Sequence, residues 1–158
     1  MQKLVSQLSV RLIFKQLKVS TVESCTGGWI GKALTDQAGS SQWFAGGLIT
    51  YTNESKTHLV AVSPDTLAKY GAVSLEVADA MARGAQQHFP GTVSVAVTGV
   101  AGPDGGSAEK PVGTVCIATF CKGKVNARKY QFTGNRDNIR EATVRQALQM
   151  VMETIDRK

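Results

Sequence analysis

Two long apolar segments constrain the fold of this chain more than any other feature. They are TVSVAVTG at residues 92–99 and VGTVCIATFC at residues 112–121, and both are rich in β-branched side chains. Strands of this kind are buried on both faces, so the sheet that they form needs helices on each side. The two segments therefore predict a layered α/β fold.

The rest of the chain supplies the expected helices. Leu4, Leu8, Leu12 and Phe14 recur at helical spacing, and Ser63-Pro64-Asp65 is a typical helix start. The expected elements are helix 3–17, strand 18–23, helix 29–37, strand 44–51, helices after Thr52, Ser63 and Ser74, strands 92–99, 112–121 and 124–132, and a helix from about Asp137. Lys122-Gly123 turns the last two strands into a hairpin. The prediction is a three-layer α/β/α sandwich with a mixed sheet.

Length and composition indicate one soluble domain over residues 1–158. No apolar run approaches the roughly 18–20 residues of a membrane span, and the N-terminal segment lacks the continuous apolar stretch of a signal peptide. We therefore expect a cytoplasmic protein that does not contact membranes. The three cysteines are too few and too scattered for a disulfide framework. With only two histidines, neither at ligand spacing from a cysteine, no metal site or cofactor is predicted.

The net charge of +6 is spread unevenly along the chain. Residues 1–18 carry four basic and no acidic side chains, and residues 122–158 carry nine basic and four acidic ones. The basic residues form no dense cluster, and aromatic residues make up only 6% of the chain. Such a pattern argues against a nucleic-acid partner and is compatible with a small anionic ligand.

Two glycine-containing loops are candidates for chemistry. Residues 23–28 (ESCTGG) connect a strand to a helix, where Ser24 lies on a rigid turn near an electropositive helix end. This position suits a nucleophile whose product is an oxyanion. Residues 98–107 (TGVAGPDGGS) hold four glycines directly after a buried strand, which indicates a backbone that approaches a ligand. Neither loop is a Walker or a dinucleotide-binding motif.

A serine nucleophile requires a base. His88 closes a helix and His58 lies further along the helix that begins after Thr52, so neither is a clear candidate. Residues 51–56 (YTNESK) bring a phenol, an amide and an amine to one strand end. A desolvated lysine can lose its proton near neutral pH, so Lys56 could serve as that base.

Six motifs in one characteristic order carry a family resemblance. They are residues 23–28, 39–41 (GSS), 51–56, 71–74 (GAVS), 98–106 and 109–115 (EKPVGTV). Together they resemble the C-terminal domain family of the competence/damage-inducible protein CinA, over about residues 5–153. The match leaves no room for the larger N-terminal domain of full-length CinA, so we expect a stand-alone form.

The resemblance implies an α/β/α sandwich and a reaction. Stand-alone members of the family include nicotinamide-nucleotide amidohydrolase, which deamidates nicotinamide mononucleotide to nicotinic acid mononucleotide and ammonia. By resemblance, Ser24 is the nucleophile, Lys56 its base and Tyr51 a proton relay or orienting partner. The predicted substrate-binding residues are Thr26, Gly27, Gly28, Asn53, Thr98, Gly99, Gly102, Gly105, Gly106 and Arg140.

The chain departs from the family pattern at a few positions. The differences at Val22, Thr52 and Ser55 leave every expected reacting group in place. Asn135 instead removes a carboxylate near the start of the last helix. One alternative is therefore an inactive or altered paralogue that acts as a nucleotide-binding module. A nucleic-acid binder ranks third. The sequence does not reveal the oligomeric state, although homo-oligomers are common among small soluble enzymes.

Overall fold

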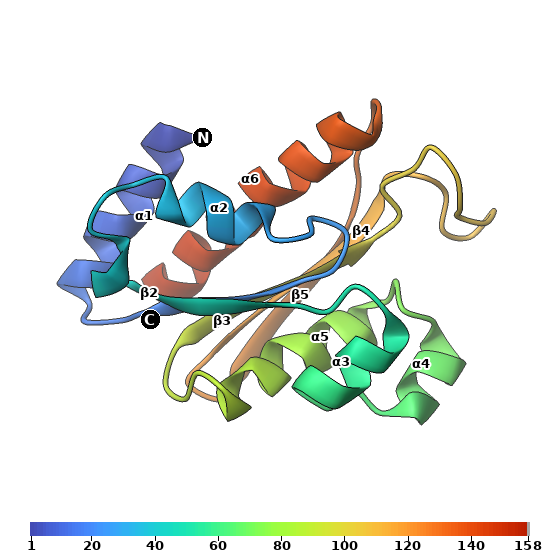
Figure 1. The fold of residues 1–158 in the computed structure, drawn as a ribbon, viewed down its shortest axis with the longest axis horizontal. Coiled ribbons are helices and arrows are strands. Elements are labelled where there is room, and N and C mark those ends of the chain that lie inside the picture. The colour runs from blue at the N-terminus through green and yellow to red at the C-terminus, as the bar shows by residue number, and fades with distance from the viewer. Residues whose placement is uncertain (158) are drawn as a thin grey trace.

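The structure, a computed structural model that describes residues 1–157, confirms the α/β prediction. A sheet with strand order β2-β1-β3-β4-β5 lies between two layers of helices (Figure 1). In chain order the elements are α1 (Gln2–Phe14), β1 (Val19–Glu23), α2 (Trp29–Thr35), η1 (Ser40–Gln42), β2 (Phe44–Ile49), α3 (Asn53–Val60), α4 (Pro64–Tyr70), α5 (Leu75–Gly84), η2 (Ala85–Gln87), β3 (Val93–Gly99), β4 (Thr114–Cys121), β5 (Lys124–Gln131) and α6 (Arg136–Asp156).

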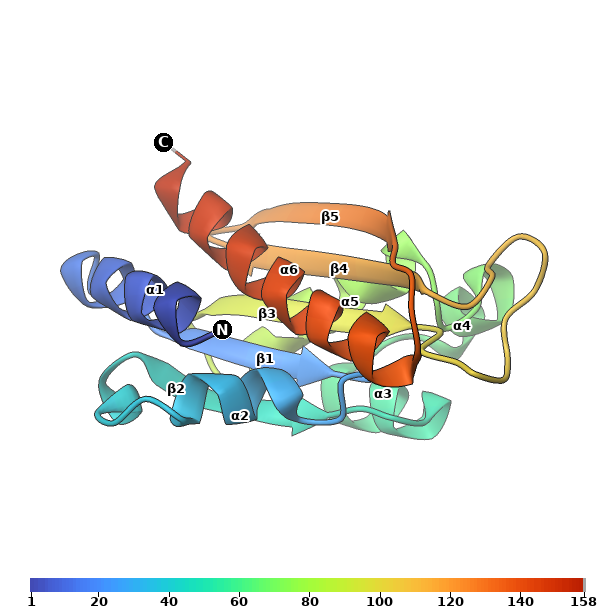
Figure 2. The ribbon, with the colours of Figure 1, turned by 90° about the horizontal axis from the view of Figure 1, so that it is seen from above.

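The sheet is mixed, as the sequence predicts. β1 pairs in parallel with β2 and β3, whereas β4 is antiparallel to both β3 and β5. Gly99 at the end of β3 pairs with Val115 at the start of β4. The β4–β5 turn, where Cys121 pairs with Lys124, therefore lies at the opposite end of the sheet from the carboxyl ends of β1 and β3 (Figure 2).

Helices cover both faces of the sheet. α1, α2 and α6 lie on one face and α3, α4 and α5 on the other (Figure 1). Side chains of β3 alternate between two apolar clusters: Val95 and Val97 pack beneath the first layer and Ala96 packs against the second. Because both clusters are buried, β3 has no face open to solvent, which explains its largely apolar sequence, and the hydroxyls of Ser94 and Thr98 donate to backbone carbonyls.

Some helices differ in detail from the expectation. Leu8 and Leu12 of α1 are buried, but Phe14 at its end is 86% exposed. The helix expected at 75–89 ends at Gly84 and continues as a short 3₁₀ turn. A Cβ atom at Gly84 would overlap the carbonyl of Val60, so only glycine lets α5 approach the end of α3 this closely.

The final helix α6 begins one residue earlier than expected and crosses the sheet obliquely (Figure 2). The buried stripe of α6 consists of Ile139, Thr143, Val144, Ala147, Leu148, Met150, Val151 and Ile155, whereas Met152 is only partly buried. Among residues 1–157, no helix has the length and apolar character needed to cross a bilayer.

Candidate active site

At the carboxyl ends of the neighbouring strands β1 and β2, the chain turns toward opposite faces of the sheet. After β1 it enters α2 on one face, and after β2 it enters α3 on the other. Ligands of α/β proteins bind at such a switch point, outside the carboxyl ends of the strands. A cavity of about 330 Å³ lies there, lined by Ser24, Cys25, Tyr51, Asn53, Lys56, Ala72, Val73, Thr98, Gly99, Val100, Ala101, Gly102, Asp104, Gly105, Gly106 and Arg136.

Ser24 and Lys56 meet in this cavity. The Lys56 Nζ atom lies 3.0 Å from Ser24 Oγ, and it also donates to the carbonyl oxygens of Thr50 at 2.8 Å and Tyr51 at 3.3 Å. The Lys56 side chain is only 1% exposed, and no carboxylate contacts its amine among the residues described. Burial in this low-dielectric site lowers the pKa of Lys56.

Local structure holds the lysine in place. Lys56 lies in the first turn of α3, whose start is a capping box: Thr52 Oγ1 accepts from the Ser55 backbone, and Ser55 Oγ accepts from the Thr52 backbone. The N–H of Thr50 donates to the carbonyl of Glu23 at 2.8 Å, which joins the end of β2 to the end of β1. The two departures from the family pattern at 52 and 55 therefore form the cap of the helix that carries Lys56.

The loop after Ser24 is built around the buried carboxylate of Glu23, which sequence reasoning missed. Its Oε2 accepts from the Thr26 hydroxyl at 2.6 Å and from the N–H groups of Gly28 and Ile30 at 3.0 and 2.9 Å. Its Oε1 accepts from Gly31 N–H at 2.8 Å. The carboxylate thus satisfies the free N–H groups at the start of α2. The sequence signal for this role was the position of Glu23, an acidic residue shortly before the start of a helix.

The neighbouring Cys25 also lines the cavity, but its environment disfavours the thiolate. Burial, reinforced by the charge of Glu23, raises the pKa of the Cys25 thiol to about 12. The thiolate is the reactive form of cysteine, so the protonated Cys25 is a poor nucleophile at neutral pH. Cys25, Cys116 and Cys121 are all free thiols.

The structure brings together most, but not all, of the predicted site residues. Nine of them line the cavity: Ser24, Tyr51, Asn53, Lys56, Thr98, Gly99, Gly102, Gly105 and Gly106. Four lie outside its lining: Thr26, Gly27, Gly28 and Arg140. The N–H of Gly27 donates to the Ser24 carbonyl and that of Gly28 to Glu23, so neither points to a ligand.

Two arginines on α6 have different roles in the geometry. Arg140 donates from Nε to the carbonyl of Cys25 at 3.2 Å and from Nη2 to that of Thr26 at 3.0 Å, and so braces the loop after Ser24. Arg136, one turn earlier, lines the cavity and donates to the carbonyl of Gly102 at 2.8 Å and to the Tyr51 hydroxyl at 3.1 Å. Sequence reasoning missed Arg136. The available signal was its place at the start of a helix, where the helix dipole disfavours a cation, so that an arginine there suggests a functional role.

The start of α6 has a complete cap despite the departure at Asn135. The Asn135 side chain accepts from the backbone of Asn138 at 2.9 Å, and the Asn138 side chain accepts from the backbone of Asn135 at 3.1 Å. The amide therefore stabilises the helix that carries Arg136 and Arg140.

The glycine-rich loop forms one wall of the cavity. Gly102, Gly105 and Gly106 have φ of +73°, +85° and +87°, a region that favours glycine. A Cβ atom at Gly106 would lie 2.9 Å from the carbonyl oxygen of Lys110, so the loop folds tightly on itself. The Thr98 hydroxyl donates to the carbonyl of Ala72 at 2.8 Å, which ties the segment at Ala72 to β3.

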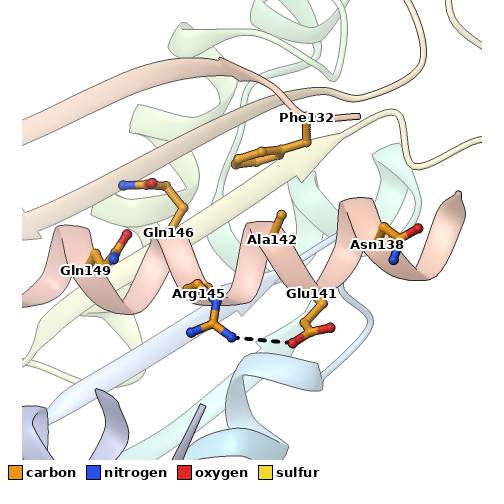
Figure 3. Close-up of a pocket in the computed structure, with 7 residues that line it drawn as sticks. All are labelled: Phe132, Asn138, Glu141, Ala142, Arg145, Gln146 and Gln149. Atoms are coloured by element: carbon orange, nitrogen blue, oxygen red, sulfur yellow. Dashed lines mark ion pairs between the residues drawn. The ribbon is translucent and has the colours of Figure 1, made fainter. Parts of the chain in front are cut away.

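A cavity of similar volume on α6 offers no comparable chemistry. It measures about 350 Å³ and lies beside Phe132 (Figure 3). Its polar groups are the amides of Asn138, Gln146 and Gln149 and the ion pair between Glu141 and Arg145. It holds no hydroxyl or thiol nucleophile among its described lining residues, whereas the cavity at Ser24 places a hydroxyl 3.0 Å from a buried amine and is the candidate active site.

Known proteins with a similar sequence include both long and short forms. The chain is 44% identical over 154 residues to the nicotinamide-nucleotide amidohydrolase PncC of Escherichia coli, covering 97% of this chain and 93% of that protein. It is 46% identical to a CinA-like protein of Leptospira biflexa but spans only 36% of that longer protein.

Solved structures of CinA superfamily proteins have the same fold as this chain. A competence-damaged protein (CinA) superfamily protein from Escherichia coli superposes with a TM-score of 0.93 at 37% identity, covering 97% of this chain and 89% of the other. The competence/damage-inducible protein CihA from Agrobacterium tumefaciens gives a TM-score of 0.89 at 44% identity, with coverages of 98% and 96%. The model of the CinA C-terminal domain matches residues 1–155, and the chain belongs to this family.

Proposed function

We propose that the protein hydrolyses the carboxamide of nicotinamide mononucleotide to nicotinic acid mononucleotide and ammonia, with Ser24 as the nucleophile. The observation that carries this proposal is the 3.0 Å contact between Lys56 Nζ and Ser24 Oγ in a buried site. The name of the Escherichia coli relative, which is similar over nearly its whole length, supports the substrate.

The contacts of Lys56 suit a neutral amine that acts as a base. A neutral amine has two N–H bonds and one lone pair. The carbonyls of Thr50 and Tyr51 can accept the two hydrogens, which directs the lone pair toward the Ser24 hydroxyl. The lowered pKa of Lys56 increases the fraction of this neutral form.

The reaction then has two stages. Ser24 Oγ attacks the carboxamide carbon while its proton passes to Lys56, and a tetrahedral oxyanion forms. The C–N bond breaks as the Lys56 ammonium gives its proton to the leaving nitrogen, so ammonia departs and a nicotinoyl–serine ester remains. Water attacks this ester, Lys56 takes the water proton and returns it to Ser24 Oγ, and the acid is released.

The backbone N–H groups of Gly99, Ala101 and Gly102 are our candidates for stabilising the oxyanion. These residues line the cavity, whereas the N–H groups of Val100, Gly27 and Gly28 already donate to Thr114, Ser24 and Glu23. Removing one such donor typically costs about 10²–10³ in rate. Tyr51 is assigned an orienting role rather than a relay, because its hydroxyl contacts Arg136 and not Lys56.

The test of this function is ammonia release from nicotinamide mononucleotide by the purified protein, with calorimetric binding of the nucleotide measured in parallel. We expect catalytic release of ammonia together with one equivalent of nicotinic acid mononucleotide. Saturable binding without ammonia release would instead support the nucleotide-binding module. Neither binding nor release would contradict the proposed substrate.

Arg136 is our candidate for the substrate phosphate. Its guanidinium has five N–H donors, of which two are used within the cavity, so others remain for a phosphate. We expect Arg136→Ala to raise KM for the mononucleotide about 10–100-fold, the value of a charge-assisted hydrogen bond. Steady-state kinetics with nicotinamide riboside, which lacks the phosphate, provide the control: the variant should process it as the parent does. Equal losses on both substrates would assign Arg136 to the support of Tyr51 instead.

A further inference from the structure

A second cavity lies at the far end of the sheet from Ser24. It measures about 600 Å³, against about 330 Å³ for the candidate active site. Its walls are the end of α1, the β4–β5 turn and the end of α6, which lie at the same end of the sheet (Figure 2). The lining residues are Lys15, Leu17, Cys121, Lys122, Lys124, Val125, Asn126, Thr154, Ile155 and Arg157.

The charged groups that line this cavity are cationic throughout the described part of the chain. Lys15, Lys122, Lys124 and Arg157 come from three separate elements, and no carboxylate of residues 1–157 is in the lining. Asp156 lies nearby and pairs with Lys15 at 3.7 Å, but it is shared with Arg11. Lys122, Lys124 and Arg157 form no ion pair with any carboxylate in residues 1–157.

The cavity has an apolar floor. Leu17, Val125 and the buried Ile155 supply apolar surface, and Cys121 and Thr154 add a thiol and a hydroxyl to the lining.

The helix dipole explains only part of the positive charge around this cavity. Lys15 and Arg157 lie at the carboxyl ends of α1 and α6, where the helix dipole favours cations without any ligand. This reason does not apply to Lys122 and Lys124, which belong to the hairpin. Lys122 has φ of +49°, a left-handed conformation in which glycine, asparagine or aspartate is preferred at this turn position. The chain therefore keeps a lysine where another residue would be more stable.

We propose that this cavity binds a small organic anion with an apolar body, such as an aromatic or aliphatic phosphate, sulfonate or carboxylate. The cationic rim would hold the anionic group, and the apolar floor would cover the body. The volume lies within the range of small-molecule sites. The proposal does not depend on the proposed amidohydrolase activity, because the two cavities lie at opposite ends of the sheet.

A matched pair of fluorescent probes tests both halves of the site. 8-Anilinonaphthalene-1-sulfonate carries an anionic group on an aromatic body, and N-phenyl-1-naphthylamine has the same rings without the charge. We expect saturable 1:1 binding of the sulfonate, at least tenfold tighter than of the neutral probe and weakened by salt. Lys122→Glu/Lys124→Glu should weaken sulfonate binding at least tenfold, whereas the control Lys3→Glu/Lys69→Glu should leave it unchanged.

A single substitution separates binding from stability. Lys122→Asn suits the left-handed turn, so we expect it to raise the melting temperature while it weakens sulfonate binding. Equal affinity for the two probes, equal loss in the control double variant, or unchanged binding in Lys122→Glu/Lys124→Glu would each overturn the proposal.

Discussion

Ser24→Ala is expected to lower kcat for nicotinamide mononucleotide by at least about 10⁴-fold, the scale seen when an acyl-transfer nucleophile is removed. The alanine methyl group fits the space of the serine side chain, which is 8% exposed. The Ser24 backbone N–H still donates to the carbonyl of Val97, so the loop should keep its conformation. Ammonia release under single-turnover and steady-state conditions measures the loss, and the melting temperature reports on folding.

The adjacent cysteine supplies the matched control for Ser24. Cys25 lines the same cavity and carries the more nucleophilic atom, but burial holds its pKa at about 12 and keeps it protonated. Cys25→Ser should therefore retain the parent rate to within about tenfold. The opposite pattern, with Ser24→Ala active and Cys25→Ser inactive, would move the nucleophile to Cys25.

Lys56→Met is expected to reduce kcat by about 10³–10⁵-fold while the protein remains folded. Methionine has a similar length and no charge, so it replaces a desolvated amine with an apolar side chain in a fully buried position. We expect only a small change in thermal stability, because the variant no longer buries an amine but leaves the carbonyls of Thr50 and Tyr51 without that donor. Lys32→Met, on the exposed face of α2, is the control and should not change kcat.

The pH profile distinguishes a base from a structural lysine. Lys56 accepts a proton only as the neutral amine, so kcat/KM should rise as the pH passes upward through its pKa. Burial lowers this pKa from the ordinary value of 10.5, so the rise should be centred below that value. The same rise should be absent from the residual activity of Lys56→Met. A profile with an identical rise in the variant would assign the titration to another group and remove Lys56 from the role of base.

Local pattern was sufficient to predict much of the fold. The apolar strands at 92–99 and 112–121 require cover on both faces, and the structure provides it with α1, α2 and α6 on one side and α5 on the other. The Lys122-Gly123 turn predicted the β4–β5 hairpin, and the antiparallel pairing of β4 with β3 also makes the sheet mixed. These features depend on residues near each other in the chain, where periodicity and turn chemistry act directly.

The site was predicted less completely, because its contacts join distant parts of the chain. The loop at Ser24 and the segment ending at Lys56 were both identified, but no local pattern states that Nζ and Oγ lie 3.0 Å apart. That distance follows from the parallel pairing of β1 with β2 and from the hydrogen bond between Thr50 and Glu23. Family resemblance, rather than spacing, linked the two residues in advance.

The two arginines of α6 show which features follow from the sequence and which depend on the tertiary structure. Arg136 and Arg140 are four residues apart, so helix geometry places them on one face, separated by about 6 Å along the axis. The sequence by itself predicted the layered α/β class, the hairpin and the loop that carries Ser24 as a candidate site, but of the two arginines it singled out only Arg140. Only the tertiary structure decided that Arg140 braces the backbone at 25–26 and that Arg136 enters the cavity. The reason is that the tilt of α6 across the sheet is set by packing of the whole buried stripe, and neither arginine belongs to that stripe.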